Sequence, residues 1–443
     1  MRELAVIGAG VTGLAAGMAS GAPVYEQSDG PGGICRSYYM VPGDHRRHAH
    51  APADDDGYRF EVGGGHWIFG ADPSMLLWLE QLAPHGRYER RAVVRFGELG
   101  ITVPYPLQNH YHELGPAITE AVATDSLRET IPLARENTLH EWLELSFGKT
   151  LCDVFFFPFH DRYAAGLSDV VAAEDSYKSP AILVPGAPVP SGSPKKVGYN
   201  AEFSYPNGGL DGLVGAMAAG CDVSYNKKLT RIDCEDKRLE FADGTEESFG
   251  TVLSTLPLDE AVRLAGLEVD EPPDPSTSVL VLNIGAVRAE LCPDAHWQYE
   301  PDSRSGFHRI GFYSNVDPSF LPASHRRRAD KVSLYVERAF RTGAQMPPGE
   351  VSEYTTSVLG ELRARRYIGD VDVVDPSFVH VAYTWRRPGS HWREQAIAAL
   401  ASKGVLQVGR YGSWQFQGIA DSIRDGLAIG ERAKRLLGAR PKA

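Results

Sequence analysis

The chain has 443 residues, with 45 Lys and Arg against 57 Asp and Glu, so its formal net charge is −12. This acidic balance argues against a general nucleic-acid-binding role, because neutralising phosphates requires clustered Lys and Arg. With 43% hydrophobic and 23% charged residues, the chain can bury a sizeable core, and its length predicts two or three domains or lobes.

The cysteines and the hydropathy pattern restrict the compartment. The five cysteines are odd in number, widely spread and contain no CxxC pair. We therefore expect a reducing compartment, the cytoplasm, without disulfides and without a metal site. The chain has no run of about 18 apolar residues, so we predict no membrane-spanning helix.

The N-terminus predicts a strand, a tight turn and a helix. A short apolar run is followed by Gly8, Gly10 and Gly13 in GxGxxG spacing and then by small residues at helical spacing. Glu26, eighteen positions after Gly8, ends the next short strand. Here glycine permits the turn, the approach of a pyrophosphate and the helix–strand contact, while the carboxylate accepts hydrogen bonds from ribose. The pattern predicts an adenine dinucleotide; the alternative is a tight structural turn.

A second glycine loop, Gly30-Pro-Gly-Gly33, follows, with Arg36 just beyond it. It resembles the GG motif of flavoproteins related to amine oxidases and protoporphyrinogen oxidase, and therefore implies FAD rather than NAD. Gly33 is expected at the cofactor, and Arg36 is expected to donate to its diphosphate. The alternative for Arg36 is a surface position.

Later elements divide the chain further. Residues 72–151 show helical spacing, residues 184–198 are rich in Pro, Gly and Ser, and short strands follow from residue 221. The predicted fold is α/β: a doubly wound Rossmann-type FAD-binding lobe, a mixed-sheet substrate lobe and a helical insertion. The FAD-binding lobe is expected to comprise residues 1–70, 181–260 and 401–443. The mainly helical insertion covers residues 71–180, and the substrate-lobe sheet covers residues 261–400.

Five segments occur in a specific order along the chain. They are FEVGGGHWIF at 60–69, VPYPLQN at 103–109, FSYPNGG at 203–209, FHR at 307–309 followed by SN at 314–315, and GRYGSW at 409–414. This order resembles UDP-galactopyranose mutase, particularly its eukaryotic branch, over about residues 4–435.

That resemblance implies a chemistry in which FAD works in its reduced form. In the mutase family the flavin N5 attacks the anomeric carbon of a nucleotide sugar, and the resulting N5–sugar adduct lets the ring reclose in the other size without net redox change. The substrate would be a small sugar-containing molecule, and an external reductant such as NAD(P)H would keep the flavin reduced.

The same resemblance implies roles for individual residues. His66 would lie beside the flavin near N5, and Arg309 would pair with the substrate diphosphate. The remaining cofactor positions would be Gly64, Gly65, Gly409 and Arg410. The substrate-binding set would be Tyr105, Asn109, Lys178, Asn207, Arg309, Trp392 and Phe416. The alternatives are a satisfied, partly buried imidazole for His66 and a solvent-facing strand position for Arg309.

Several positions depart from the mutase pattern. Lys178 stands where the family has a second diphosphate arginine, and Val316, the segment 390–392 and Phe416 stand where it has diphosphate-binding tyrosines. Each missing hydroxyl would leave about 1–3 kcal/mol unsupplied for the same ligand. We infer that the flavin machinery is kept and the substrate has changed.

Three functions therefore compete. The first is a mutase-like rearrangement of a nucleotide-linked or otherwise activated sugar. The second is a net-redox FAD oxidoreductase, of amine oxidase or desaturase type, that acts on a small molecule without UDP. The third is a relative that binds FAD without catalysis.

Overall fold

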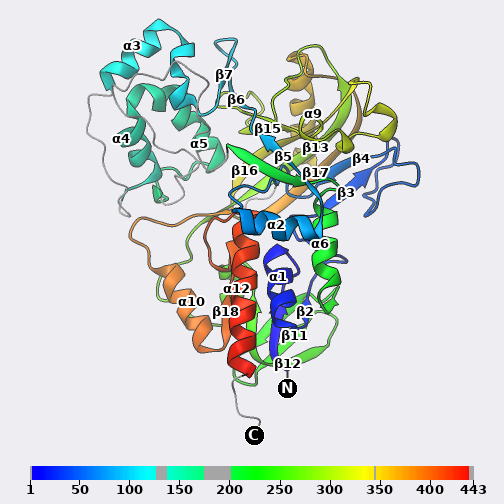
Figure 1. Cartoon of the computed structure of the whole chain (residues 1–443). Helices are drawn as coiled ribbons and strands as arrows, with labels where there is room; N and C mark the ends of the chain where they lie inside the picture. The colour runs from blue at the N-terminus through cyan, green and yellow to red at the C-terminus, as the bar shows by residue number, and fades with distance from the viewer. Residues whose placement is uncertain (1, 126–136, 174–200, 344–345, 439–443) are drawn as a thin grey trace.

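The structure is a computed structural model that describes residues 2–125, 137–173, 201–343 and 346–438. Figure 1 shows a lower lobe around α1 and α12, an upper sheet lobe covered by α9, and a helical lobe that contains α3, α4 and α5.

The lower lobe contains a sheet assembled from segments far apart in the sequence. Its central strands are parallel. The hairpin formed by β10 and β11 extends the sheet, with β11 antiparallel to β12. β18 pairs with β12 in parallel. The strands are β1 (Arg2–Ile7), β2 (Val24–Tyr25), β9 (Val223–Ser224), β10 (Leu229–Asp233), β11 (Arg238–Phe241), β12 (Glu246–Ser254) and β18 (Val405–Gln407).

Alternating apolar residues let this sheet bury both faces. Leu4 and Val6 of β1 belong to one core cluster, while Ala5 and Ile7 belong to another, as the period of two in a strand requires. The first face packs against α1 (Val11–Ser20), α6 (Leu210–Ala219) and α12 (Ile419–Gly438). The second face packs against α7 (Leu258–Leu264) and α10 (Trp392–Ser402).

The upper lobe contains a mixed sheet, ordered β17-β13-β16-β15-β14-β6-β7. Only the β14–β6 pairing is parallel among these strands. Helix α9 (Pro348–Ala364) covers one face of the sheet. The strands are β6 (Ala92–Phe96), β7 (Ile101–Pro104), β13 (Ser276–Arg288), β14 (Trp297–Tyr299), β15 (Arg309–Phe312), β16 (Lys331–Arg341) and β17 (Ile368–Thr384).

The remaining elements connect the lobes. Two separate two-stranded sheets are antiparallel: β3 (Ser37–Met40) with β4 (Tyr58–Glu61), and β5 (His85–Glu89) with β8 (Glu202–Pro206). The other helices are α2 (Pro73–Leu82), α3 (Pro116–Asp125), α4 (Leu139–Leu151), α5 (Phe157–Tyr163), α8 (Tyr313–Val316) and α11 (Gly409–Gly412). Short 3-10 turns occupy Leu107–Asn109, Tyr111–Leu114, Pro318–Phe320 and Ala323–His325, and a π turn occupies Cys152–Phe156.

This architecture confirms the predicted doubly wound lobe with a mixed-sheet lobe. The range 71–180, predicted as mainly helical, also contributes β5, β6 and β7, and two of these strands extend the upper sheet. β6 forms a local antiparallel hairpin with β7, and it joins the upper sheet by pairing with β14, about 200 residues later in the chain.

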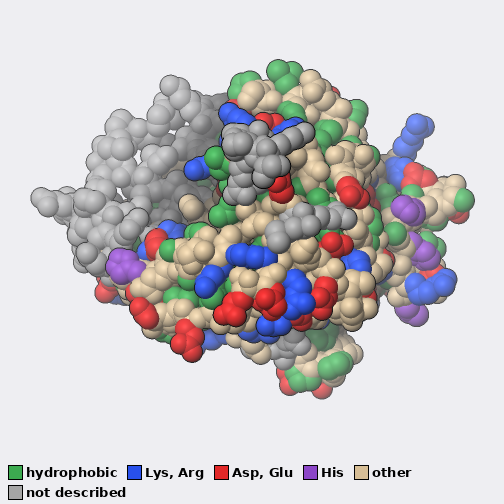
Figure 2. Space-filling model, turned by 90° about the horizontal axis from the view of Figure 1, so that it is seen from below, with side chains coloured by type: hydrophobic (Ala, Val, Ile, Leu, Met, Phe, Trp, Pro, Cys, Tyr) green, Lys and Arg blue, Asp and Glu red, His purple; other side chains and the backbone are tan. Residues whose placement is uncertain are grey.

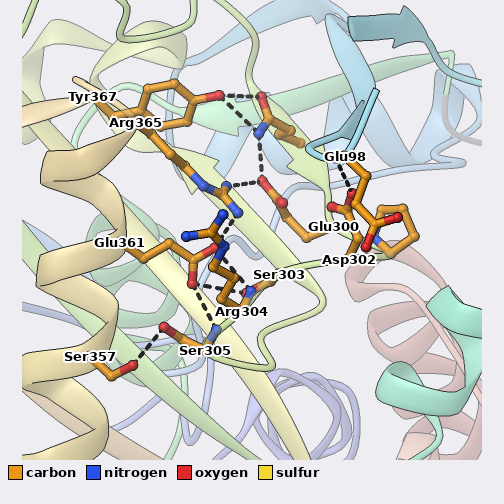
Figure 3. Close-up of polar contacts among 12 residues, drawn as sticks. Glu98, Glu300, Asp302, Ser303, Arg304, Ser305, Ser357, Glu361, Arg365 and Tyr367 are labelled. Atoms are coloured by element: carbon orange, nitrogen blue, oxygen red, sulfur yellow. Dashed lines mark hydrogen bonds and ion pairs between the residues drawn. The ribbon is translucent and has the colours of Figure 1, made fainter. Parts of the chain in front are cut away.

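A buried ion-pair network fastens α9 to the segment after β14 (Figure 3). Arg365 Nη1 donates to Glu300 Oε1 over 2.6 Å, and the same guanidinium pairs with Glu361. Glu361 in turn accepts from the N–H groups of Arg304 and Ser305, at 3.1 and 2.7 Å. The Arg365 and Glu300 side chains are 7% and 0% exposed.

The surface seen from below mixes charges of both signs (Figure 2). Histidine side chains gather at one edge of that view, and His45, His48 and His50 belong to the exposed loop 43–57. His48 Nε2 lies 3.0 Å from Asp44 Oδ2. Within the described ranges, no helix is long and apolar enough to cross a membrane.

Candidate active site

The turn after β1 has the geometry that the GxGxxG spacing predicts. Gly8 has a φ of +95°, and a Cβ on Gly13 would lie 1.8 Å from Gly8 O, so only glycine lets α1 begin this close to β1. A Cβ on Gly10 would meet no atom within 4 Å. Helix α1 begins at this open space without a side-chain cap or an acidic residue in its first turn. Its N-terminal N–H groups can therefore receive an anion.

Glu26 is fixed beside this turn. The residue is 6% exposed, and its Oε2 accepts from the Ala9 N–H over 2.7 Å. Its Oε1 accepts from the N–H and the hydroxyl of Ser28, at 2.8 and 2.7 Å. A carboxylate has about four lone-pair sites, so Glu26 retains capacity for ribose hydroxyls.

The second glycine loop lies directly on the first turn, because the Gly32 N–H donates to Ala9 O over 2.8 Å. Gly33 has a φ of +59°, a conformation that favours glycine. Arg36 Nη1 donates to Asp29 Oδ1 over 2.8 Å, and its side chain is 22% exposed. The structure thus gives Arg36 a neighbouring carboxylate as its partner, and its contact with a diphosphate stays a prediction.

The C-terminal motif closes over the same region. Gly409 has a φ of +77°, and a Cβ there would lie 2.4 Å from Thr12 Oγ1, so α11 touches the first turn of α1. The Tyr411 hydroxyl is shielded from solvent and has no hydrogen-bond partner in the part of the chain that the structure describes. An open glycine face, an uncapped helix N-terminus and an orphaned buried hydroxyl fit a dinucleotide cofactor such as FAD.

The glycine run before His66 carries the backbone against β16. A Cβ on Gly64 would lie 2.7 Å from Glu337 Oε1, and a Cβ on Gly65 would lie 2.0 Å from the Tyr335 hydroxyl. These glycines are thus explained by their approach to two buried side chains. Their predicted approach to a cofactor is not required to account for them.

His66 is a neutral imidazole in this environment. Its Nδ1 lies 3.2 Å from Gly64 O. Burial lowers the pKa of His66 to about 4, and the positive charges of Arg410 and Arg309 act in the same direction. A ring near two guanidinium groups is therefore suited to hold or pass a hydrogen bond and poorly suited to carry charge.

Arg309 is held by a carboxylate that the sequence reasoning did not identify. β15 and β16 place Arg309 directly opposite Glu337. Arg309 Nε and Nη2 donate to Glu337 Oε2 and Oε1, each over 2.7 Å. Burial would raise the pKa of Glu337, but the Arg309 guanidinium and His308 outweigh it and lower the pKa to about 2. Glu337 is 2% exposed and Arg309 is 24% exposed at the side chain, so the arginine reaches the surface of the site.

Two tyrosines each lie near Arg309 and one further arginine. Burial raises the pKa of Tyr299, and the charges of Arg309 and Arg90 both lower it. Burial raises the pKa of Tyr383 to about 12, and the charges of Arg309 and Arg410 both lower it. Each hydroxyl thus lies within the field of two guanidinium groups.

Arg410 and Phe416 form one unit beside this row. Arg410 Nη2 donates to Ala382 O over 2.6 Å, and its guanidinium carbon lies 4.3 Å from the Phe416 ring centre. Phe416 therefore supports the arginine as a cation–π partner. Its predicted contact with a substrate stays a prediction.

Of the other predicted substrate residues, Tyr105 contacts the tyrosine row of the site. Tyr105 packs against Tyr299 with ring centres 4.6 Å apart, and Asn109 ends the following 3-10 turn. Asn207 is exposed, and its N–H donates to Pro84 O over 2.9 Å. Lys178 lies outside the described residues.

Trp392 does not fit its predicted role in stacking on a sugar. The side chain is 1% exposed and packs edge-on against Trp414, with ring centres 5.2 Å apart. Both rings belong to the core on the α7 and α10 face of the lower sheet. Large aromatic side chains are highly buried on average, and Trp392 is a core residue of this kind.

Sequence reasoning missed Glu337, Arg90, Tyr299 and Tyr383. A signal existed for one of them: the acid Glu337 directly follows the apolar run Leu334-Tyr-Val in a predicted strand. A charge within a buried strand requires a partner. For the other three, the position depends on which strands pair, and a single sequence does not specify the pairing.

Solved structures share this fold across nearly the whole chain. The crystal structure of reduced UDP-galactopyranose mutase is 21% identical, with a TM-score of 0.79 over 100% of this chain and 97% of that chain. A CLA-producing fatty acid isomerase from P. acnes is 16% identical, with a TM-score of 0.60 over 97% and 98%. Putrescine oxidase bound to putrescine is 15% identical, with a TM-score of 0.59 over 99% of both chains.

A family model also matches most of the sequence. The family model described as flavin containing amine oxidoreductase matches residues 22–429. This range includes Glu26, the second glycine loop, the His66 loop and the C-terminal motif. The chain therefore belongs to the family of flavin-containing amine oxidoreductases, and its cofactor is a flavin.

Proposed function

We propose that the protein is an FAD enzyme that rearranges an activated sugar with an anionic leaving group, in the manner of a pyranose–furanose mutase. The flavin would be held by the α1 N-terminus, Glu26 and the C-terminal motif. When bound and reduced, it supplies the nucleophilic N5 for this chemistry. The side chains of this protein would bind and orient the substrate and its leaving group.

The observation that carries the proposal is the excess of positive charge. Arg90, Arg309 and Arg410 act on the two tyrosines of the site, and Glu337 is the acid that acts with them. A local surplus of cations in a chain of net charge −12 favours an anionic ligand. It disfavours a cationic amine, because desolvating a like charge beside guanidinium groups is costly.

Arg309 and Arg410 would bind and orient the departing phosphate or other anion. Arg309 uses Nε and Nη2 on Glu337, which leaves Nη1 for a ligand. The charge of Arg309 acts on the Tyr299 and Tyr383 hydroxyls, and both hydroxyls can donate to an anion. They offer hydroxyl donors at positions other than those of the mutase family, in line with a changed substrate.

His66 would position the loop that faces the flavin. Because its pKa is lowered to about 4, the ring stays neutral at neutral pH and adds no further positive charge. Its Nδ1 contact with Gly64 O couples the imidazole to the backbone beside Glu337. The likeness to reduced UDP-galactopyranose mutase supports this assignment at the level of the fold.

An anaerobic assay tests the proposal. Purified holoprotein is incubated with a panel of sugar nucleotides and sugar phosphates, with the flavin either oxidised or reduced by dithionite, while products and the flavin spectrum are followed. The expected result is isomerised product with reduced flavin only and without net electron transfer. Bleaching of oxidised flavin by a substrate, with no reductant added, would instead establish the net-redox oxidoreductase.

A matched pair of variants tests the role of the charges. Arg309→Lys keeps one positive charge and loses the planar fork, so kcat/KM should fall about tenfold or more. Arg328→Lys makes the same change at an exposed position and should leave kcat/KM unchanged. Equal activity of the two variants would remove Arg309 from the mechanism.

A further inference from the structure

One carboxylate in the site is shared between an arginine and a histidine. His308, the residue before β15, is 1% exposed, and its Nε2 lies 3.4 Å from Glu337 Oε2. The same Oε2 accepts from Arg309 Nε. His308 also lies against α5, with its ring centre 5.6 Å from that of Tyr163 and 6.3 Å from that of Phe159.

His308, Glu337 and Arg309 form a triad, and this arrangement gives the triad two charge states. With a neutral imidazole, Arg309 and Glu337 cancel, so the triad presents little net charge to the site. With a protonated imidazole, Glu337 serves two cations, and one positive charge remains unbalanced beside the ligand. At this short range in a partly dry site, that charge acts strongly on a bound anion.

The other groups around the triad hold their charge between about pH 5 and 8. Glu337 stays ionised, His66 stays neutral, and the pKa values of Tyr299, Tyr335 and Tyr383 are raised by burial. The arginines stay protonated. The groups around the triad include Tyr335 on β16, Tyr299 on β14, Tyr383 on β17, Tyr163 on α5 and His66 in the glycine loop. The buried Glu300, whose N–H donates to His308 O over 2.9 Å, is paired with Arg365.

We infer that His308 and Glu337 are positioning residues that set the charge which Arg309 presents, so that anion binding strengthens as His308 gains a proton. This inference rests on the proposed function in one respect: the anionic part of the substrate binds at Arg309. Neither residue needs to touch the substrate. His308 acts through Glu337, and Glu337 acts through the fork of Arg309.

Sulfate binding to the oxidised holoprotein tests the inference without turnover. Sulfate keeps its charge over this range, so any pH dependence of its Kd belongs to the protein. Calorimetry should show a Kd severalfold to about tenfold lower at about pH 5.5 than at about pH 8. In His308→Gln the side chain can still donate to Glu337 but cannot titrate, so the two Kd values should agree.

Three further variants make the result decisive. Glu337→Gln removes the counter-charge, so its Kd at about pH 8 should match or fall below that of the wild type at about pH 5.5. His45→Gln alters an exposed loop histidine and should keep the wild-type pH dependence. Arg309→Lys should weaken sulfate binding at both pH values. Flavin content and Tm are measured for every variant, so that a folding defect is recognised.

Two results would overturn the inference. One is a His308→Gln protein, folded and flavin-loaded, with the same pH dependence as the wild type. The other is an Arg309→Lys protein that binds sulfate as tightly as the wild type. Absence of sugar turnover alongside the expected sulfate behaviour would contradict the proposed function alone, and the two failures are therefore distinguishable.

Discussion

Gly10 and Gly13 belong to one motif but are required for different physical reasons. A Cβ on Gly13 would collide with Gly8 O at 1.8 Å, whereas a Cβ on Gly10 would meet nothing within 4 Å. Gly13 allows the contact between α1 and β1, and Gly10 leaves space in front of the helix N-terminus. The folded protein needs Gly13 even without cofactor, while Gly10 matters only once the cofactor is bound.

Substitution by alanine should separate these two roles. In flavin-free protein, Gly13→Ala should lower the free energy of unfolding by about 1–3 kcal/mol or more through overpacking, while Gly10→Ala should change it by less than about 1 kcal/mol. Both should weaken FAD binding, because each disturbs the pyrophosphate position. Urea unfolding and flavin fluorescence titration measure the two effects. Equal stability of the two variants would contradict the assigned contacts.

His296 gives a pH-dependent stability at the same scale. The residue is 3% exposed, and Arg91 Nε donates to its Nε2 over 3.1 Å. Burial and the Arg91 charge lower its pKa to about 4. Since the unfolded chain takes up the proton near pH 6.5, this contribution is complete above that pH and is lost as the pH falls towards 4.

The expected loss between about pH 7 and about pH 5 is about 2 kcal/mol from this one group. His296→Gln cannot titrate, so its free energy of unfolding should fall by about 2 kcal/mol less than that of the wild type over the same interval. Chemical denaturation at the two pH values provides the measurement. Parallel curves for the two proteins would show that His296 ionises in the folded protein as it does in the unfolded chain.

At the scale of elements, the attachment of α9 depends on the buried network in Figure 3. Arg365→Met would leave Glu300, whose side chain is 0% exposed, without its cation. We expect a loss of about 3–5 kcal/mol in the free energy of unfolding, because an uncompensated buried carboxylate remains. Adding Glu300→Gln to Arg365→Met should recover part of that loss, since the orphaned charge is removed.

A surface pair provides the control for this prediction. Arg263 and Glu260 pair at 2.7 Å with side chains that are 66% and 41% exposed. Arg263→Met should change stability by no more than about 0.5 kcal/mol. Guanidinium chloride unfolding compares the two single variants, and similar losses in both would show that the α9 network is hydrated.

Elements with strong local patterns were predictable from sequence. The apolar run of β1, the glycine turn and the small-residue pattern of α1 are contiguous, so their spacing identified them. The strands β5 and β6 were not predicted. β5 pairs with β8 from a distant part of the chain, and β6 pairs both with its neighbour β7 and with the distant β14. The candidate site divides in the same way: Gly8 to Glu26 follows from a local motif, whereas the Arg309–Glu337 pair follows from the register of β15 on β16.

At the scale of the whole molecule, both ends of the chain are needed to build one lobe. Figure 1 shows α12 lying beside α1, although more than 400 residues separate their starts. A Cβ on Gly426 would lie 2.2 Å from Thr12 O, and a Cβ on Gly430 would lie 2.6 Å from Ala16 O. Backbones this close require glycine. Packing of α12 on α1 therefore depends on Gly426 and Gly430 as well as on the apolar face of α12.

Gly426→Ala tests this joint between the termini. The added methyl group must push α12 away from the first turn of α1, so we expect a loss of about 1–3 kcal/mol in the free energy of unfolding. FAD binding should also weaken, because Thr12 contacts Gly409 at the cofactor turn.

Gly360→Ala is the matched control. Gly360 lies within α9, is exposed and has nothing within 4 Å of its Cβ position, so this variant should raise the free energy of unfolding by up to about 1 kcal/mol. Thermal unfolding and flavin retention measure both variants. If Gly426→Ala were as stable and as well loaded with flavin as Gly360→Ala, the two termini would not be packed backbone to backbone, and the C-terminal helix would be dispensable for the cofactor site.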